Sequence, residues 1–261
     1  MHFGIDKWTS IYYNIVAYIG QAYAVHIFLL HTFMASKLHR FYKEDFPYAY
    51  LGGFRMRYES AKEIERKRIM CKKAVSTIRS NEKYFQLDNV KEAADLVLSE
   101  YIADRETAIP VPIVRIITDA GFAIFLQDMP LSMGGYIAMN GECEERFGND
   151  RIIVINNQNK ANRRRFTLAH EFGHYVLDPA ARNVVEYYDA FEKDDVINDT
   201  EELVNRFAAE LLMPEDLFII KYEEIKDKFT DYYERSKNMA DFFAVPIESV
   251  KKRFLEVGIE A

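Results

Sequence analysis

The chain has 261 residues, of which 49% are apolar, enough for one large domain or for one domain with an appendage. Its formal net charge of −7 argues against a protein that coats nucleic acid through bulk electrostatics. The two cysteines, Cys71 and Cys143, are too few and too far apart for a disulfide framework, so a reducing compartment is expected.

The first fifty residues form an unusual segment. Residues 8–36 contain no formally charged side chain, and a stretch of that length is a candidate transmembrane helix. Polar side chains within it also suit a helix packed on protein, and a start at a later methionine would remove the segment. Residues 1–50 are therefore expected to be an apolar helical appendage or a membrane anchor. If the segment spans a membrane, the basic residues after it favour a cytoplasmic location for the rest of the chain.

Residues 51–86 are rich in basic side chains. Ten Lys/Arg and four Asp/Glu lie between Arg55 and Lys83. The stretch from Tyr58 to Lys83 lacks Gly and Pro, which predicts a helix that links the appendage to the remainder of the chain. An exposed, solvated helix is the ordinary explanation of such a charge run, and a seat on anionic lipid is the alternative.

The remainder, residues 87–261, mixes helical and strand patterns. Amphipathic runs predict helices at 88–103 and 111–120, and β-branched runs predict strands at 122–126 and 151–156. Glycines mark turns between the strands, and helical patterns continue from there to the end of the chain. This order predicts an α+β fold in which a small antiparallel or mixed sheet packs on helices.

A short motif, HEFGH, lies in a helix predicted from Asn162, its expected cap, to Leu177. On a helix His170 and His174 share one face, at a separation that suits two corners of a tetrahedral zinc site. Glu171 lies beside the first histidine, where it could take a proton from a metal-bound water. Gly173 has no side chain, which leaves room for the metal or for the backbone of another element to approach the helix.

A third ligand is needed, and the predicted helix at residues 198–214 offers one in its first turn. Glu201 has Asn205 one turn further along the same face, where the amide could hydrogen-bond a ligand imidazole. Glu202 competes for the same role, and a capping acid is the structural alternative for either residue. Two histidines and one carboxylate would leave a fourth position of Zn²⁺ open, as in catalytic sites.

Two stretches, RRRFTLAHEFGH and EELVNRFAAELLMP, together resemble the ImmA/IrrE family of metallopeptidases. The upstream stretches KEAADLVLSEY, IPVPIVRIITDAGFAIF and RIIVIN are also similar, so the resemblance runs from about Leu87 to the C-terminus. The family pattern has a glutamate three residues before an Ala-Asn or Ala-Asp pair. Glu201 lies three residues before the pair Val204-Asn205, in which Val replaces the Ala of the family pattern. The resemblance therefore implies that Glu201 is the third ligand.

The resemblance implies a compact zinc peptidase of the gluzincin type that cuts a regulatory protein at one site. The implied substrate is a helix-turn-helix repressor of a phage or mobile element, or a repressor in a DNA-damage response. The acidic run at residues 186–202 could steer such a basic substrate. Residues 1 to about 80 have no counterpart in the family.

Substrate contacts are expected near the strand that precedes the metal helix. Ile152 and Val154 lie on that strand, which we expect to be an edge strand of the sheet with which an extended peptide could pair. Tyr136, together with Tyr187 and Tyr188, is a candidate to stabilise the oxyanion.

The tail, residues 239–261, resembles the helix-turn-helix-like end of such proteins. It predicts two short helices joined at Val245-Pro246. Three basic residues of the second helix, Lys251, Lys252 and Arg253, make a small phosphate footprint, so packing on the catalytic core is favoured over binding DNA. Two rival functions remain: a binding module that sequesters a partner without cutting it, and a DNA-binding regulator with a vestigial metal site.

Overall fold

The computed structural model describes residues 48–51, 54–57, 60–102, 109–178, 187–190 and 199–259. The chain divides into two compact units, residues 1–59 and residues 60–261. In the first unit β1 (Tyr48–Leu51) pairs antiparallel with β2 (Phe54–Arg57). This hairpin corrects the expectation of helix where the predicted appendage meets the predicted linker. Residues 8–36 lie outside the described part of the chain, and no helix within that part is both long and apolar enough to cross a bilayer.

The second unit begins with the basic helix. Helix α3 (Ala61–Arg79) starts at Ser60, whose hydroxyl accepts a hydrogen bond from the amide of Glu63. The helix predicted from Tyr58 to Lys83 is confirmed, although it begins three residues later and ends four residues earlier than predicted. Its buried face carries Cys71, Val75 and Ile78, which belong to the main core. The helix is thus part of the compact second unit, whereas the sequence suggested a linker outside the folded domain.

Two short 3₁₀ turns (Glu82–Phe85 and Leu87–Asn89) lead into α4 (Val90–Leu98), and α5 (Ile113–Asp119) comes next. Helix α4 buries one apolar side, as its amphipathic pattern predicts. The two predicted helices are confirmed, although both are shorter than the patterns indicated.

The sheet of the second unit has four strands in the order β3-β5-β4-β6. They are β3 (Ala123–Gln127), β4 (Gly135–Met139), β5 (Arg151–Asn156) and β6 (Tyr187–Ala190), and α6 (Gly141–Phe147) connects β4 to β5. β3 runs parallel to β5, and the other pairs are antiparallel, which confirms the α+β fold with a mixed sheet. β5 therefore lies between two strands and is not the edge that its sequence pattern suggested.

The two faces of the sheet bury different side chains, because successive residues of a strand point to opposite sides. Ile137, Ile153 and Ile155 join the main core with the helices. Ile152 and Val154 join a small second cluster that also contains Met129, Ala138 and Cys143.

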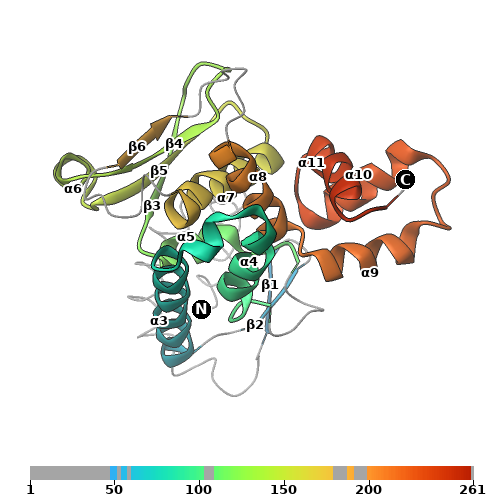
Figure 1. The fold of residues 1–261 in the computed structure, drawn as a ribbon, viewed down its shortest axis with the longest axis horizontal. Coiled ribbons are helices and arrows are strands. Elements are labelled where there is room, and N and C mark those ends of the chain that lie inside the picture. The colour runs from blue at the N-terminus through green and yellow to red at the C-terminus, as the bar shows by residue number, and fades with distance from the viewer. Residues whose placement is uncertain are drawn as a thin grey trace, which may run out of the picture. The chain divides into compact units, whose positions relative to one another are not determined.

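The long helices after the sheet are α7 (Ala161–Leu177) and α8 (Asp199–Leu212), which pack closely on each other. Helices α9 (Glu215–Ile225), α10 (Tyr232–Phe243) and α11 (Ile247–Glu256) complete the unit and lie on the far side of α8 from the sheet (Figure 1). Phe218 of α9 stacks on Phe243 of α10 and contacts Phe254 of α11 edge to face, so one aromatic cluster joins these three helices. The predicted joint in the tail is confirmed, since α10 ends at Phe243 and α11 begins after Pro246.

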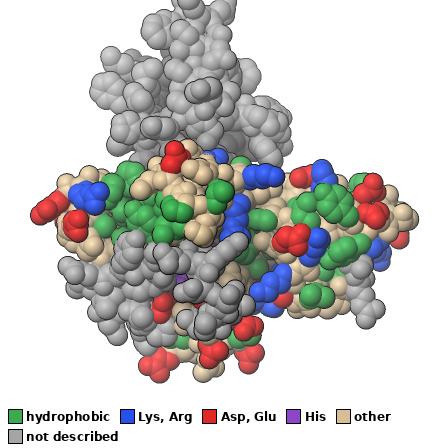
Figure 2. Space-filling view, turned by 90° about the horizontal axis from the view of Figure 1, so that it is seen from above, with side chains coloured by type: hydrophobic (Ala, Val, Ile, Leu, Met, Phe, Trp, Pro, Cys, Tyr) green, Lys and Arg blue, Asp and Glu red, His purple; other side chains and the backbone are tan. Residues whose placement is uncertain are grey.

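The tail is tied to the core by polar contacts that the sequence did not reveal. Arg253, one of the three basic residues considered for DNA, is fully buried and forms a bidentate ion pair with Glu210 at 2.5 and 2.8 Å. On the face shown in Figure 2, acidic and basic side chains are interspersed over these helices without forming one basic stripe. Both observations favour the packing alternative for the tail.

Candidate metal centre

Helix α7 carries the motif and is held at its first turn by the tail. Lys160, and not Asn162, occupies the N-cap position of α7, without a side-chain capping hydrogen bond, and Asn162 instead donates a hydrogen bond to the carbonyl of Val245 at 3.1 Å. Arg165, almost fully buried, donates to the carbonyls of Ala244 and Val111 at 3.1 and 2.8 Å. The start of α7 is therefore fixed to two distant parts of the chain.

His170 and His174 face each other on the buried side of α7. Their Nε2 atoms lie 3.1 Å apart, and both side chains are buried. Burial, together with the neighbouring His174, lowers the pKa of His170 to about 4. The ring is therefore neutral near pH 7, which is the form that binds a metal ion.

Glu201, in the first turn of α8, completes the cluster. Its carboxylate oxygens lie 3.2 Å from His174 Nε2 and 3.5 Å from His170 Nε2. Burial opposes the ionisation of Glu201, but the hydrogen bond from His174 and the two nearby imidazoles outweigh it and lower its pKa. Glu202 is exposed to solvent, so Glu201 is the acid that faces the histidines.

These three side chains fit a metal ion. Ligand atoms about 2.0–2.1 Å from a tetrahedral Zn²⁺ lie roughly 3.3–3.4 Å from one another. The two imidazole nitrogens lie 3.1 Å apart, and the two carboxylate oxygens of Glu201 lie 3.2 Å from His174 Nε2 and 3.5 Å from His170 Nε2, respectively, so both oxygens are within reach of an ion held by the histidines. Two neutral imidazoles and a carboxylate are also a donor set that zinc accepts, with a corner left for water or substrate.

Asn205 orients one ligand, and Asp178 lies close to the other. Asn205 Oδ1 lies 3.2 Å from His170 Nδ1, and the Asn205 amide donates to the carbonyl of Glu201 at 2.8 Å. Asp178, at the end of α7, places a carboxylate oxygen 3.6 Å from His174 Nδ1. Such outer partners hold a ring so that its other nitrogen faces the metal. Asn205 is predicted from the sequence and Asp178 is not, although an acid four residues after a ligand histidine is a visible signal.

Glu171 comes directly after His170 on α7 and is fully buried. Helical geometry turns its side chain by about 100° from that of His170, so it lies beside the three-residue cluster and is not a member of it. The structure thus keeps Glu171 apart from the ligand set while holding it in the same buried region.

The approach of α8 to α7 depends on Gly173. A Cβ atom at this position would lie 2.9 Å from Val204 Cγ1 and 3.2 Å from Phe207 Cδ1, closer than side chains normally pack. The absent side chain therefore makes room for α8, the element that supplies Glu201. This agrees with the expectation that another part of the chain approaches here.

The three proposed substrate contacts are not on the metal side of the sheet. Ile152 and Val154 belong to the second cluster, and Tyr136 packs against that cluster as well. The face that packs on α7 carries the alternate residues Ile153 and Ile155. The expected substrate contacts by Ile152, Val154 and Tyr136 are therefore not supported. The side chains of the other two tyrosine candidates, Tyr187 and Tyr188, lie outside the described residues.

Comparisons with known proteins point to one family. Residues 119–255, more than half of the chain, match the peptidase family model described as the IrrE N-terminal-like domain. The chain is 41% identical over 64 residues to the radiation response metalloprotease IrrE of Deinococcus radiodurans, covering 24% of this chain and 20% of that protein. It is 41% identical over 66 residues to the protein of the same name from Deinococcus deserti, covering 25% and 24%. The matched part thus spans about a fifth to a quarter of these relatives.

A solved structure titled as a Mycobacterium tuberculosis transcriptional regulator also aligns with the chain. The alignment has a TM-score of 0.40 and 14% sequence identity, and it covers 69% of this chain and 51% of the other.

Proposed function

The chain belongs to the IrrE N-terminal-like peptidase family, and we propose that it is a zinc-dependent endopeptidase. Membership supports a metallopeptidase role, and one observation carries the finer proposal. His170, His174 and Glu201, from two different helices, bring one ligand atom each to within 4.8 Å of one another, with the two imidazole nitrogens 3.1 Å apart. A structural metal site would enclose its ion with four protein ligands, whereas three leave one position for chemistry.

The proposed roles of the residues are based on their positions. His170, His174 and Glu201 would hold the zinc ion, which when bound polarises a peptide carbonyl and makes water more acidic. Glu171 takes the proton of the attacking water and delivers it to the nitrogen of the leaving amine. Asn205 and Asp178 hold the two imidazoles in the ligand tautomer.

The substrate proposal is a single cut in a regulatory protein, a helix-turn-helix repressor of a phage or mobile element. Its support is the family resemblance and the acidic run at residues 186–202, which would attract a basic DNA-binding protein. The names of the Deinococcus relatives, radiation response metalloproteases, agree with a regulatory role for proteins of this kind.

Glu171→Gln tests the proposal. The amide cannot accept the proton of the attacking water, so we expect cleavage to fall by roughly 10²–10⁴-fold while metal content stays unchanged. The assay uses the purified chain loaded with zinc and purified helix-turn-helix repressors as candidate substrates, taken first from neighbouring reading frames. Mass spectrometry of the fragments locates the cut.

The same variant separates hydrolysis from sequestration. If Glu171→Gln inactivates the partner as well as the parent chain does, the protein acts by binding and the peptidase proposal is wrong. If the parent chain with zinc leaves every repressor candidate intact but degrades an unfolded test protein, the peptidase stands and the substrate proposal is wrong.

A further inference from the structure

The loop between β3 and β4, residues 128–134, lies against the metal helix one turn before the metal ligands. Thr167 of α7 precedes His170 by three residues and Glu171 by four, so its side chain lies on their side of the helix. A Cβ atom at Gly134 would lie 3.4 Å from Thr167 Oγ1 and 3.5 Å from Thr167 Cγ2. The end of the loop is therefore in contact with the side of α7 that carries the metal centre.

A buried asparagine fixes the conformation of this loop. Asn156, at the end of β5, is fully buried. Its amide group donates hydrogen bonds to three carbonyls of the loop at 2.9–3.1 Å, those of Met129, Pro130 and Met133. Its side-chain oxygen accepts a hydrogen bond from the amide of Met129 at 3.3 Å. A buried polar side chain with this many hydrogen bonds holds the surrounding backbone in one arrangement.

Leu131 lies at the tip of the loop. The amide of Met133 donates to the carbonyl of Pro130 at 3.0 Å, which closes a four-residue turn with Leu131 and Ser132 at its corners. Leu131 is 76% exposed. Exposure of a single leucine needs no special explanation, and Leu255 of α11 is 81% exposed. Leu131 differs from Leu255 because it is carried on a fixed turn beside the metal helix.

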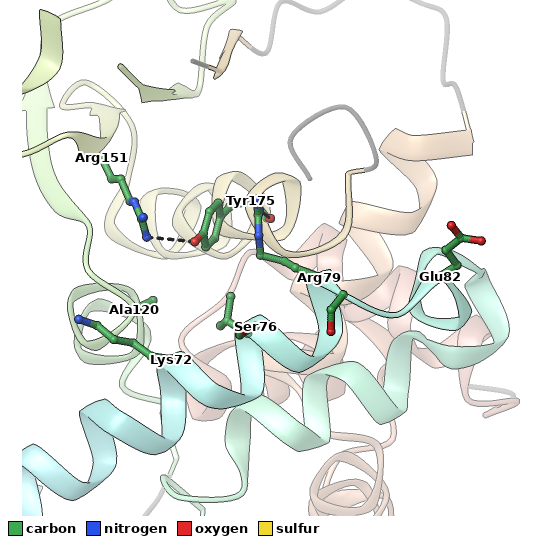
Figure 3. Close-up of a pocket in the computed structure, with 9 residues that line it drawn as sticks. Lys72, Ser76, Arg79, Glu82, Ala120, Arg151 and Tyr175 are labelled. Carbon is green, nitrogen blue, oxygen red and sulfur yellow. Dashed lines mark hydrogen bonds between the residues drawn. The ribbon is translucent and has the colours of Figure 1, made fainter. Parts of the chain in front are cut away.

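A cleft beside the end of α7 does not lead to the metal ligands. Figure 3 shows this cleft between α3 and α7, and none of the described residues that line it belongs to the metal centre. Arg151 Nη1 donates to the Tyr175 hydroxyl at 3.1 Å, and the guanidinium carbon of Arg79 lies 4.0 Å from the centre of the Tyr175 ring. Because α8 covers α7 at Gly173, a polypeptide is expected to reach the ligands from the side that carries Thr167.

We propose that the β3–β4 loop forms one wall of the substrate site and that Leu131 receives an apolar side chain of the bound polypeptide. This inference rests on the proposed peptidase function and gives it a selectivity. A fixed loop suits that role because binding to a preformed surface costs little conformational entropy. The leucine side chain favours an apolar partner, since burying a charged group against it would remove water from that charge without compensation.

The geometry limits where the selected side chain can lie. Leu131 is three residues from Gly134, at most roughly 11 Å away, and Thr167 is roughly 5 Å along the helix from His170. With the contact between Gly134 and Thr167, the path from Leu131 to the ligands is about 20 Å, which an extended peptide covers with about six residues. The apolar residue should therefore lie within about six positions of the cut bond.

The test compares Leu131→Asp with Leu255→Asp, which both change an exposed leucine to an acid. The zinc-loaded full chain is incubated with a heat-denatured mixture of bacterial proteins, and mass spectrometry records the residues around every cut. We expect the parent chain and Leu255→Asp to select an apolar residue at one fixed position within this range. With a peptide copied from a preferred site, kcat/KM of Leu131→Asp should fall roughly tenfold or more. Leu131→Asp should instead accept Lys or Arg at that position, with zinc content and Tm unchanged.

The proposal is overturned if the parent chain shows no apolar preference in this range, or if Leu131→Asp keeps the preference of Leu255→Asp. It is also overturned if Leu131→Asp loses zinc or melts at a lower temperature, since Leu131 would then have a structural role. In each of these cases the peptidase function stands, because the parent chain cuts. If the zinc-loaded parent chain cuts no protein of the mixture and no repressor, the peptidase proposal itself is wrong, and this inference is wrong with it.

Discussion

Glu201 is the residue on which the metal centre depends most, because it comes from a different helix than the two histidines. His170 and His174 would share a face on any helix, whatever surrounds it. Glu201 reaches both rings only because α8 packs against α7 at this point. Its neighbour Glu202 has the same chemistry but is exposed to solvent.

Glu201→Ala and Glu202→Ala form a matched pair. Removing the carboxylate from the cluster should lower zinc affinity by more than roughly a hundredfold, since even the loss of an outer partner costs about 10–100-fold. Glu202→Ala should bind zinc like the parent chain. Competition with a chromophoric chelator measures both affinities. Equal affinities in the two variants would exclude Glu201 as a ligand.

Among the helices, α7 and α8 are the pair that makes the site, and the absence of a side chain at Gly173 sets how close they come. Val204 and Phe207 of α8 occupy the space where a Cβ atom would lie. Val204 stands where the family pattern has Ala, so this contact is already tighter here than the pattern requires.

Gly173→Ala is expected to destabilise the protein even though Ala favours a helix by about 1 kcal/mol. The added methyl group should separate α7 from α8 at a net cost of roughly 1–3 kcal/mol and weaken zinc binding. Gly173→Ala combined with Val204→Ala removes the closest clash and should recover part of both losses. Thermal unfolding and chelator competition provide the readouts. A higher Tm in Gly173→Ala alone would contradict this account of the packing.

At the scale of the whole molecule, the C-terminal tail fastens both helices of the metal centre. It receives hydrogen bonds from Asn162 and Arg165 at the start of α7. It also contributes Arg253, which pairs with Glu210 on α8, the helix of Glu201. A buried pair of this kind contributes little net stability, but removing Arg253 leaves the buried Glu210 with only the longer contact from Arg206 at 3.3 Å among the described residues.

Arg253→Met should therefore cost up to about 3–5 kcal/mol in the free energy of unfolding, because Glu210 stays buried and charged and, within the described part of the chain, keeps only the contact from Arg206. The double change Arg253→Met with Glu210→Leu should restore most of that stability, since it removes both charges. Denaturant unfolding of the two variants compares these values. If the double variant is as unstable as the single one, lost packing and not the poorly compensated charge of Glu210 is responsible.

The basic helix α3 also belongs to the folded unit. Val75 and Ile78 are buried in the main core, and full burial of such a side chain contributes about 1.5–3 kcal/mol. A fragment of residues 60–261 should therefore fold and bind zinc, whereas a fragment of residues 87–261 should lose several kcal/mol of stability and unfold readily. Circular dichroism during heating compares the two fragments. Equal melting temperatures would show that α3 is dispensable.

The sequence by itself determined the features that depend on local spacing. The helical period of 3.6 residues places His170 and His174 on one face, and it places Asn205 one turn after Glu201. The same period predicted the two short helices around Val245-Pro246. The basic run at residues 58–83 likewise predicted α3, because it contains neither Gly nor Pro.

Only the tertiary structure decided the features that depend on distant parts of the chain. The strand Arg151–Asn156 is internal because Ala123–Gln127 pairs on its free side, and its alternation places Ile152 and Val154 away from the metal helix. Likewise, Asp178 reaches His174, Arg253 is buried, and Arg79 and Arg151 meet at Tyr175. Such contacts join residues whose separation in the sequence carries no periodic signal, so only long-range packing brings them together.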